Sequence, residues 1–269
     1  MKKILVMLST LLLITACSKS VTSLDEIKQE GKLTVAVSPD YAPYEFLDIS
    51  KTGQDQYVGA DIELAKFIAQ ELDLELELKS MDFADIPSAI NLGKFHLGIS
   101  GFTYSEERAE QILFSDAYDN SESTCQGFLV QKERNNDFSS MNDFADKTIA
   151  MQNGSLQQTY ANAQLPEANH RLINKLDDAI LELKYGKVDA VAISCESAKS
   201  FMLNNEDIIL SDVKFDVIDE EGMMVIMAKE QTDLQQAVND AIAKVKAEGL
   251  YVQWMAEANK LAEEIGAMD

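Results

Sequence analysis

The chain of 269 residues is 46% hydrophobic and 26% charged, which is typical of a globular protein of one or two domains. Its formal net charge is −23, from 23 Lys and Arg against 46 Asp and Glu. A surface with this excess of negative charge repels nucleic-acid phosphates and the anionic face of a bilayer, so nucleic-acid binding is excluded.

The first residues have the pattern of a secretory signal. Two lysines precede an apolar run over residues 4–16, which is too short to span about 30 Å of hydrocarbon. The run ends in LITAC, which resembles the bacterial lipoprotein box, whose cysteine is lipidated (for example with palmitate) after cleavage. We therefore predict a signal peptide over residues 1–17, lipidation of Cys17, and a polar tether over 18–23. A plain secretory signal is the alternative.

Two further cysteines, Cys125 and Cys195, follow in the mature chain. Export permits a disulfide, but two cysteines alone do not specify one. We expect two buried free thiols, with a disulfide as the alternative.

Short apolar strands alternate with amphipathic helices along the rest of the chain, which indicates α/β architecture. The first run has predicted strands and helices at Leu33–Val37, Asp61–Leu72, Glu75–Lys79, Ile86–Leu92 and Phe95–Ile99. The second run has them at Thr148–Met151, Ser155–Ala161, Leu176–Tyr185 and Val188–Ile193. The C-terminal part is helical. A capping box of Thr232 and Gln235 is predicted to open one helix, and a second covers Val252–Ile265.

A weak internal repeat links the two runs. The segments Ala89–Ser100 and Glu182–Ser194 both contain a helix end, Gly-Lys, a strand and a terminal serine. The repeat predicts two similar lobes, and ligands of open parallel sheets bind beyond the carboxyl ends of the strands. We therefore expect Ser100 and Ser194 to face one another across a cleft between lobes.

Motifs for nucleotide, phosphate, serine-hydrolase or zinc chemistry (GxGxxG, the Walker loop, GxSxG, HExxH) do not occur in the sequence. Only two histidines are present. No cofactor, metal or catalytic constellation is expected, and ligand binding is favoured over enzymatic activity.

Five segments in order resemble the polar amino-acid class of bacterial extracellular solute-binding proteins, the receptors of ABC importers. They are SPDYAPYEF, YVGADIELAKFIAQEL, GKFHLGISGFTYSEER, IAMQNGSLQQTY and, in part, GKVDAVAIS. The resemblance implies a two-lobed clamp of type II, each lobe a mainly parallel sheet flanked by helices. Lobe 1 would comprise residues 24–118 and 225–269, and residues 119–224 would supply two hinge crossings and lobe 2.

The resemblance also implies a carboxylate clamp. Arg108 matches the family arginine that binds the ligand's α-carboxylate, and a guanidinium suits this role because its planar donors bind a carboxylate bidentately. The family places Gly101, through its backbone N–H, and Thr103 beside it. In lobe 2, Gly154 and Ser155 precede a helix whose free N–H groups can receive an anion. The family's carboxylate contact from this lobe falls on Ser155 and the N–H of Leu156. A surface arginine paired with glutamate, and a helix-capping serine, are the alternatives.

Other matched positions would surround the rest of the ligand. Tyr41 and Tyr57 correspond to walls that sandwich the ligand side chain, with half-buried core tyrosines as the alternative. Ser38 is a further candidate for a polar contact. Glu45 is a candidate reader of a basic side chain, and a solvent-facing structural acid is the competing interpretation.

The sequence departs from the family where the ligand's α-ammonium is usually bound by Asp or Glu. Ser194 stands at that position, followed by Cys195 and Glu196. His96 is a second departure, since Asp is usual there. Either Glu196 replaces the missing acid, or the ligand is a carboxylate without a standard α-amino group.

The leading hypothesis is a monomeric, membrane-tethered receptor outside the cytoplasmic membrane that delivers an amino acid or small carboxylate to an ABC permease. A dehydratase-like enzyme on the same scaffold is one alternative, and a sensor or adhesin without transport is another.

Overall fold

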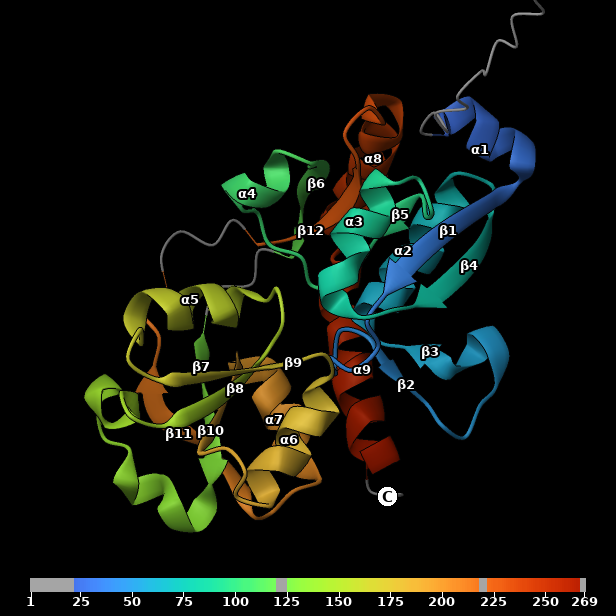
Figure 1. Ribbon diagram of the computed structural model, residues 1–269. Coiled ribbons are helices and arrows are strands. Elements are labelled where there is room, and N and C mark those ends of the chain that lie inside the picture. The colour runs from blue at the N-terminus through green and yellow to red at the C-terminus, as the bar shows by residue number, and fades with distance from the viewer. Residues whose placement is uncertain (1–21, 120–124, 218–221, 267–269) are drawn as a thin grey trace, which may run out of the picture.

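Two five-stranded sheets form the cores of two lobes (Figure 1). The computed structural model describes residues 22–119, 125–217 and 222–266. The first sheet contains β1 (Lys32–Val37), β4 (Glu75–Ser80), β5 (Leu97–Gly98), β6 (Ile112–Asp119) and β12 (Met223–Ala228). The second contains β7 (Gln126–Gln131), β8 (Thr148–Gln152), β9 (Asn169–Ile173), β10 (Ala190–Ser194) and β11 (Ile208–Lys214). A small ribbon pairs β2 (Phe46–Leu47) with β3 (Tyr57–Val58).

One strand in each sheet runs against the other four. The strand orders are β4-β1-β5-β12-β6 and β11-β7-β10-β8-β9. In the first sheet, β12 is antiparallel to both of its neighbours, and the pairings of β1 with β4 and β5 are parallel. In the second sheet, β7 is antiparallel to both of its neighbours, and the pairings of β8 with β9 and β10 are parallel. The predicted α/β class with mainly parallel sheets is therefore confirmed.

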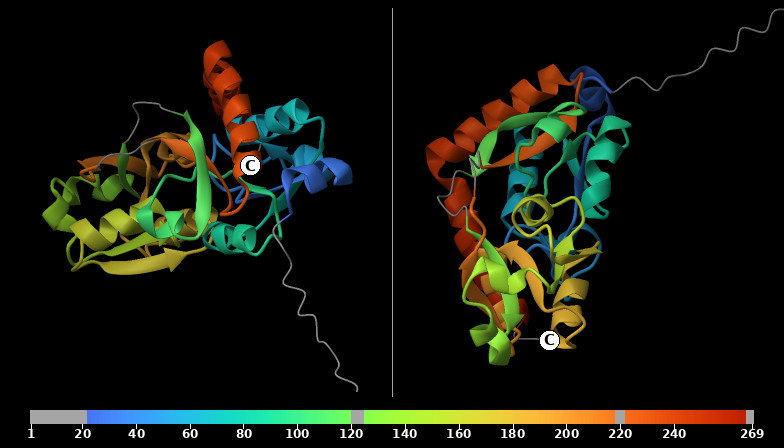
Figure 2. Two further views of the ribbon diagram at one scale, coloured as in Figure 1. Left: turned by 90° about the horizontal axis from the view of Figure 1, so that it is seen from above. Right: turned by 60° about the vertical axis from the view of Figure 1, so that its left-hand side comes forward.

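Helices cover the faces of both sheets (Figure 1). They are α1 (Leu24–Glu30), α2 (Ala60–Glu71), α3 (Ile86–Asn91), α4 (Glu106–Ala109), α5 (Leu156–Gln164), α6 (Leu176–Lys184), α7 (Cys195–Leu203), α8 (Thr232–Glu248) and α9 (Leu250–Gly266). α9 contacts α2 in the first lobe and α7 in the second, so it lies along both, as the right-hand view of Figure 2 shows. None of the helices within the described residues is long and apolar enough to cross a membrane.

Strand β10 shows how burial on two faces produces a continuous apolar sequence. Ala190 and Ala192 belong to one hydrophobic cluster of the second lobe, and Val191 and Ile193 belong to the cluster on the opposite face. Successive side chains of a strand point to opposite faces, so a strand covered on both sides is apolar at every position.

Two predicted details of local structure are wrong. Thr232 is the first residue of α8 and makes no capping box, because the N-cap is Gln231 and has no side-chain capping bond. Gln235 instead donates its Nε2 proton to the carbonyl oxygen of Phe114 at 2.6 Å. The strand predicted over residues 95–99 is only Leu97–Gly98, although backbone N–H groups on both sides still bond to β1 carbonyls.

Several predicted segments lie outside the described residues. They are the signal peptide, Cys17, most of the tether, and residues 120–124 and 218–221 of the two crossings. The described part begins at residue 22, and the Ser23 hydroxyl caps α1 by accepting from the Glu26 N–H.

The expectation of two free thiols is wrong, because Cys125 and Cys195 form a disulfide with a Cα–Cα distance of 5.4 Å. The pairing of β7 with β10 explains it. Gln126 lies opposite Ser194, and the Cys195 N–H donates to the Cys125 carbonyl oxygen at 2.9 Å. The antiparallel ladder thus places the two cysteines side by side at its end, although 70 residues separate them.

Loss of this disulfide should lower stability, because it removes a crosslink that closes a long loop in the unfolded chain. Replacing both cysteines by serine is expected to lower the free energy of unfolding by about 2–4 kcal/mol. Thermal melts with and without reductant measure the effect, and reductant should shift the unmodified protein only. Equal melting temperatures for both proteins would contradict the prediction.

Candidate functional site

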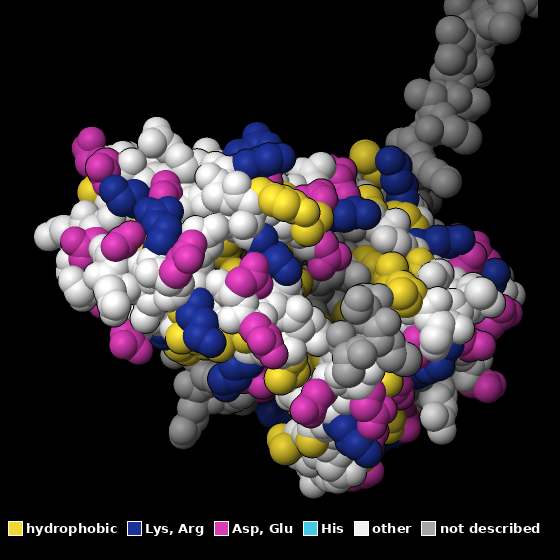
Figure 3. Space-filling model, turned by 90° about the horizontal axis from the view of Figure 1, so that it is seen from below, with side chains coloured by type: hydrophobic (Ala, Val, Ile, Leu, Met, Phe, Trp, Pro, Cys, Tyr) yellow, Lys and Arg dark blue, Asp and Glu magenta, His cyan; other side chains and the backbone are white. Residues whose placement is uncertain are grey.

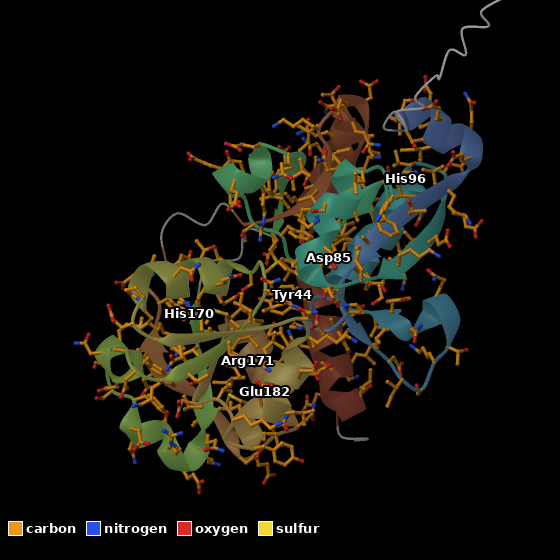
Figure 4. All side chains as sticks on the ribbon, in the orientation of Figure 1. Tyr44, Asp85, His96, His170, Arg171 and Glu182 are labelled. Atoms are coloured by element: carbon orange, nitrogen blue, oxygen red, sulfur yellow. A yellow bond between two sulfur atoms is a disulfide. The ribbon has the colours of Figure 1, made fainter. Side chains whose placement is uncertain are left out.

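A cavity of about 220 Å³ lies between the two lobes. Tyr44, labelled in Figure 4, lines it at the junction of the lobes. Nine of the twelve predicted site residues are in the cavity wall: Ser38, Tyr41, Ser100, Gly101, Thr103, Arg108, Ser155, Leu156 and Ser194. Ser38 follows β1, Ser100 follows β5, and Ser194 ends β10, so the strand ends of both lobes meet at this cavity.

The Arg108 guanidinium lies in the cavity wall between the lobes. Its N–H groups donate to the carbonyl oxygen of Thr103 at 3.0 Å and to that of Gly154, in the second lobe, at 2.5 Å. Its Cζ atom lies 5.5 Å from the ring centre of Phe102 and 5.7 Å from that of Phe83, which stack on each other. Burial lowers the pKa of Arg108, but arginine remains protonated in proteins. Arg108 is therefore a fixed cation in the cavity wall.

Ser105 and Ser155 are both helix caps, and Ser155 lines the cavity. The Ser105 hydroxyl accepts from the Arg108 N–H at 3.2 Å and begins α4 as predicted. The Ser155 hydroxyl accepts from the Gln158 N–H at 3.2 Å and begins α5. Leu156 is the first residue of α5, and the N-terminus of a helix favours an anion. Gly154 lies outside the cavity wall, and its carbonyl is the acceptor for Arg108.

The two predicted aromatic walls have different outcomes. Tyr41 lines the cavity and stacks on Tyr44, with ring centres 5.0 Å apart and planes inclined by 20°. Tyr57 does not line the cavity, since it packs against the hydrophobic core of the first lobe from β3. The second aromatic wall is instead Phe83, next to Arg108.

The expected role of the Gly101 N–H is wrong, because this group is already bonded within the protein. It donates to Asp61 Oδ2 at 2.9 Å, and the hydroxyls of Tyr118 and Tyr251 donate to the same carboxylate at 2.8 and 2.6 Å. Burial raises the pKa of Asp61, and these three donors oppose the rise. Gly101 lines the cavity at a φ of 61°, where a Cβ would meet the Tyr41 ring at 3.3 Å. Glycine is therefore needed there.

Glu196 does not replace the missing acid in this structure. Its carboxylate pairs with Lys199 at 2.8 Å and accepts from the Asn259 side chain at 3.4 Å, outside the cavity wall. Ser194 does line the cavity, and its hydroxyl accepts from the Ser197 N–H at 3.2 Å, which caps α7. His96 is a buried part of the first lobe, and its Nδ1 accepts from the Thr34 N–H at 3.1 Å. Figure 4 shows His96 away from the junction of the lobes.

Glu45 is not a solvent-facing acid. It is 1% exposed and lines the cavity. Its Oε1 atom accepts from the Ser100 hydroxyl at 2.6 Å, while its buried Oε2 receives no donor from the described residues. Burial raises the pKa of Glu45 well above its usual range, and the charges of Asp61 and Asp40 raise it further. A carboxyl group in a cavity wall is stabilised in its charged form by a cation beside it.

Sequence reasoning missed a second acid, a methionine and three amides in the cavity. Asp119 lines it at the end of β6, and Met223 lines it at the start of β12. Gln126, Gln152 and Gln157 line it from the second lobe, where Gln157 Nε2 donates to Gln126 Oε1 at 2.7 Å. Gln157 lies in the matched segment IAMQNGSLQQTY, so that motif could have identified it as a candidate site residue. Asp119 lies at the end of a strand, outside every matched segment, so no motif pointed to it.

The charged groups of the cavity wall form a definite pattern. Among the described lining residues, Arg108 is the one cation, and Glu45 and Asp119 are the two acids. The outer surface is different, because Figure 3 shows basic and acidic side chains intermingled over the face that it presents. Among the described lining residues, the acids therefore outnumber the cation.

Comparisons with known proteins agree with this architecture. The model of "Bacterial extracellular solute-binding proteins, family 3" matches residues 33–257. The arginine-binding extracellular protein ArtP of Bacillus subtilis is 30% identical over 241 residues, covering 88% of each chain.

Two solved structures are similar. One is the amino acid ABC transporter substrate-binding protein AbpA of Streptococcus pneumoniae bound to L-arginine, with a TM-score of 0.82 and 36% identity over 88% of this chain and 98% of that one. The other is the ancestral amino acid-binding protein AncCDT-1, a precursor of cyclohexadienyl dehydratase, with a TM-score of 0.77 and 29% identity over 87% and 98%. The family match over most of the chain, together with the two-lobed fold, places this protein among the family 3 bacterial extracellular solute-binding proteins.

Proposed function

We propose that the protein is the receptor of an ABC importer and that its ligand is a cationic L-amino acid of the arginine type. The observation that carries the proposal is the charge pattern of the cavity wall, one arginine and two acids. L-Arginine has one carboxylate and two cationic groups, so each of its charges finds an opposite charge. A zwitterion with an uncharged side chain has one cationic group fewer and would make fewer ionic contacts with the wall.

Arg108 binds the ligand carboxylate in this proposal. Two of the five guanidinium N–H donors are used by backbone carbonyls, and the others are available for a ligand. The N–H groups at the start of α5, from Leu156 onward, add donors from the second lobe. Ser38, Thr103 and Ser155 line the same cavity and complete the polar surroundings.

The two cavity acids bind the ligand's cationic groups. Glu45, which lines the cavity, pairs with the side-chain guanidinium, whose apolar stem lies against the Tyr41 ring. Burial and the neighbouring carboxylates raise the pKa of Glu45, and a cation bound beside it would favour its ionised form. Asp119 takes the place of the missing acid for the α-ammonium, with the Ser194 hydroxyl beside it.

Closure of the two lobes encloses the ligand. Lobe 1 comprises residues 24–118 and 225–269, residues 119–224 supply lobe 2, and the chain crosses twice at a hinge. In support, the strands of the first sheet come from residues 32–119 and 223–228, and those of the second from 126–214. Since the cavity wall contains residues of both lobes, only the closed state gains both sets of contacts.

The receptor works outside the cytoplasmic membrane as a monomer, attached through lipidated Cys17 and the tether. The lipoprotein box in the sequence and the extracellular character of the family support this location. The importer's permease is its partner.

A thermal-shift panel tests the ligand class. Residues 18–269, stripped of ligand, should melt at a higher temperature with L-arginine, because ligand at 100 times Kd stabilises by about 2.7 kcal/mol. Agmatine, which lacks the carboxylate, should give little shift. Arg108→Ala should weaken L-arginine binding roughly 100-fold, since it removes charge-assisted hydrogen bonds.

The matched control is Arg171→Ala, which removes an exposed arginine paired with Glu182 at 2.8 Å, both labelled in Figure 4. It should bind normally. A panel without any response to L-arginine would refute the proposed ligand. Conversion of L-arginine during incubation, followed by NMR, would favour the dehydratase-like enzyme instead.

Glu45→Gln should lower the preference for L-arginine over L-glutamine about tenfold, because a carboxamide cannot neutralise the ligand's cationic side chain. Calorimetric titration with both amino acids measures this preference. Glu77→Gln, which changes a half-buried acid outside the cavity wall that pairs with Lys32 and Lys79, is the control and should leave the preference unchanged. An unaltered preference in Glu45→Gln would show that Glu45 does not read the side chain.

Cys17→Ala should release the protein from the membrane, because the substitution removes the lipid attachment site. Fractionation of cells expressing the full chain measures the membrane-bound share. If the variant stays in the membrane fraction as the unmodified protein does, the anchor is not at Cys17.

A further inference from the structure

Asp40 is a buried carboxylate that bonds across the boundary between the lobes without lining the ligand cavity. It is 8% exposed and follows β1 of the first lobe. Its Oδ2 atom accepts from the Leu176 N–H at 2.8 Å and from Gln152 Nε2 at 3.2 Å, both in the second lobe. Its Oδ1 atom accepts from the hydroxyl of Ser38, in its own lobe, at 3.0 Å.

The bond to Leu176 supplies a cap that helix α6 lacks. Leu176 is the first residue of α6, and the N-cap residue Lys175 makes no side-chain capping bond. The first N–H groups of a helix have no partner inside the helix, and a negative charge at that end is favourable. Asp40 therefore caps a helix of the opposite lobe, as an N-cap aspartate would do within one chain segment.

This cap exists only while the lobes are closed. Separation of the lobes would transfer the Asp40 carboxylate, the Leu176 N–H and the Gln152 amide to water. A contact that is present in one state alone shifts the equilibrium toward that state.

We propose that Asp40 is a positioning residue for closure, which caps α6 from the opposite lobe and so lengthens the time that a ligand stays bound. The inference rests on the proposed receptor function, but Asp40 itself touches no ligand. Its place in the segment SPDYAPYEF, between the cavity residues Ser38 and Tyr41, couples the cap to the ligand-binding wall.

A second hydrogen bond between the lobes provides a matched control. Asn174 Nδ2 donates to Asp82 Oδ2 at 2.8 Å, and this pair is exposed to solvent. Water competes for such a pair, so it contributes little to closure. Asp82→Ala removes an aspartate that also bridges the lobes, next to the same helix.

The test measures the dissociation of L-arginine from residues 18–269 by stopped flow. Asp40→Ala should speed dissociation roughly tenfold while the association rate changes less than about twofold, because the lost contacts form after the encounter. Asp82→Ala should leave both rates within about twofold of the unmodified protein. Gln152→Ala should speed dissociation less than Asp40→Ala does. In the double variant, the change in the logarithm of the dissociation rate should be smaller than the sum of the two single changes.

A second readout needs no ligand. Spin labels on cysteines placed at the exposed positions Leu92 and Tyr185 report the distance between the lobes. In ligand-free protein, Asp40→Ala should shift this distance distribution toward longer distances. If the unmodified protein does not bind L-arginine, the proposed ligand fails, and the distance measurement alone decides the role of Asp40.

Dissociation and lobe distances that match those of the unmodified protein would overturn the proposal. A thermal melt checks that each variant is folded. If Asp40→Ala does not fold, Asp40→Leu, which keeps the branched shape but cannot accept a hydrogen bond, decides. It should show faster dissociation, and an unchanged rate would refute the cap.

Discussion

The guanidinium of Arg108 is a cation enclosed between two lobes, and the rest of the cavity depends on how its charge is balanced. Burial of an unpaired charge is costly. Two backbone carbonyls, one from each lobe, and the faces of Phe83 and Phe102 surround the group but carry no full negative charge. A carboxylate brought by a ligand would supply that charge, so the proposed closure and ligand binding would favour each other.

Negative charge around the cavity is in excess over this one cation. Glu45 and Asp119 line the cavity, and Asp40 and Asp61 are buried close by. The structure assigns each of the last two a role within the protein, since Asp61 fixes the Gly101 loop and Asp40 spans the lobes. Glu45 differs, because one of its oxygens lacks a donor among the described residues. The cavity is thus suited to a ligand that carries positive charge beyond a simple zwitterion.

Much of the fold was predictable from sequence, because helical periodicity and apolar strands are local signals. The five motifs also occur in the same order as in the family, which indicates how these elements are arranged. The places of Arg108 and Ser155 in the cavity wall were also predictable, since each lies in a motif at a helix start. The remainder depends on contacts between distant segments. The Cys125–Cys195 disulfide follows from a strand pairing, the Gly101 N–H is taken by Asp61, and Glu196 faces α9. The burial of Glu45 likewise depends on packing that no local pattern encodes.

A crystal structure of residues 18–269 grown with L-arginine tests the central claim most directly. The account predicts the ligand carboxylate at about 2.7–2.9 Å from the Arg108 guanidinium nitrogens, with the ligand's own guanidinium directed toward the Glu45 carboxyl group. A ligand bound in the opposite orientation, or outside the cavity between the lobes, would contradict it.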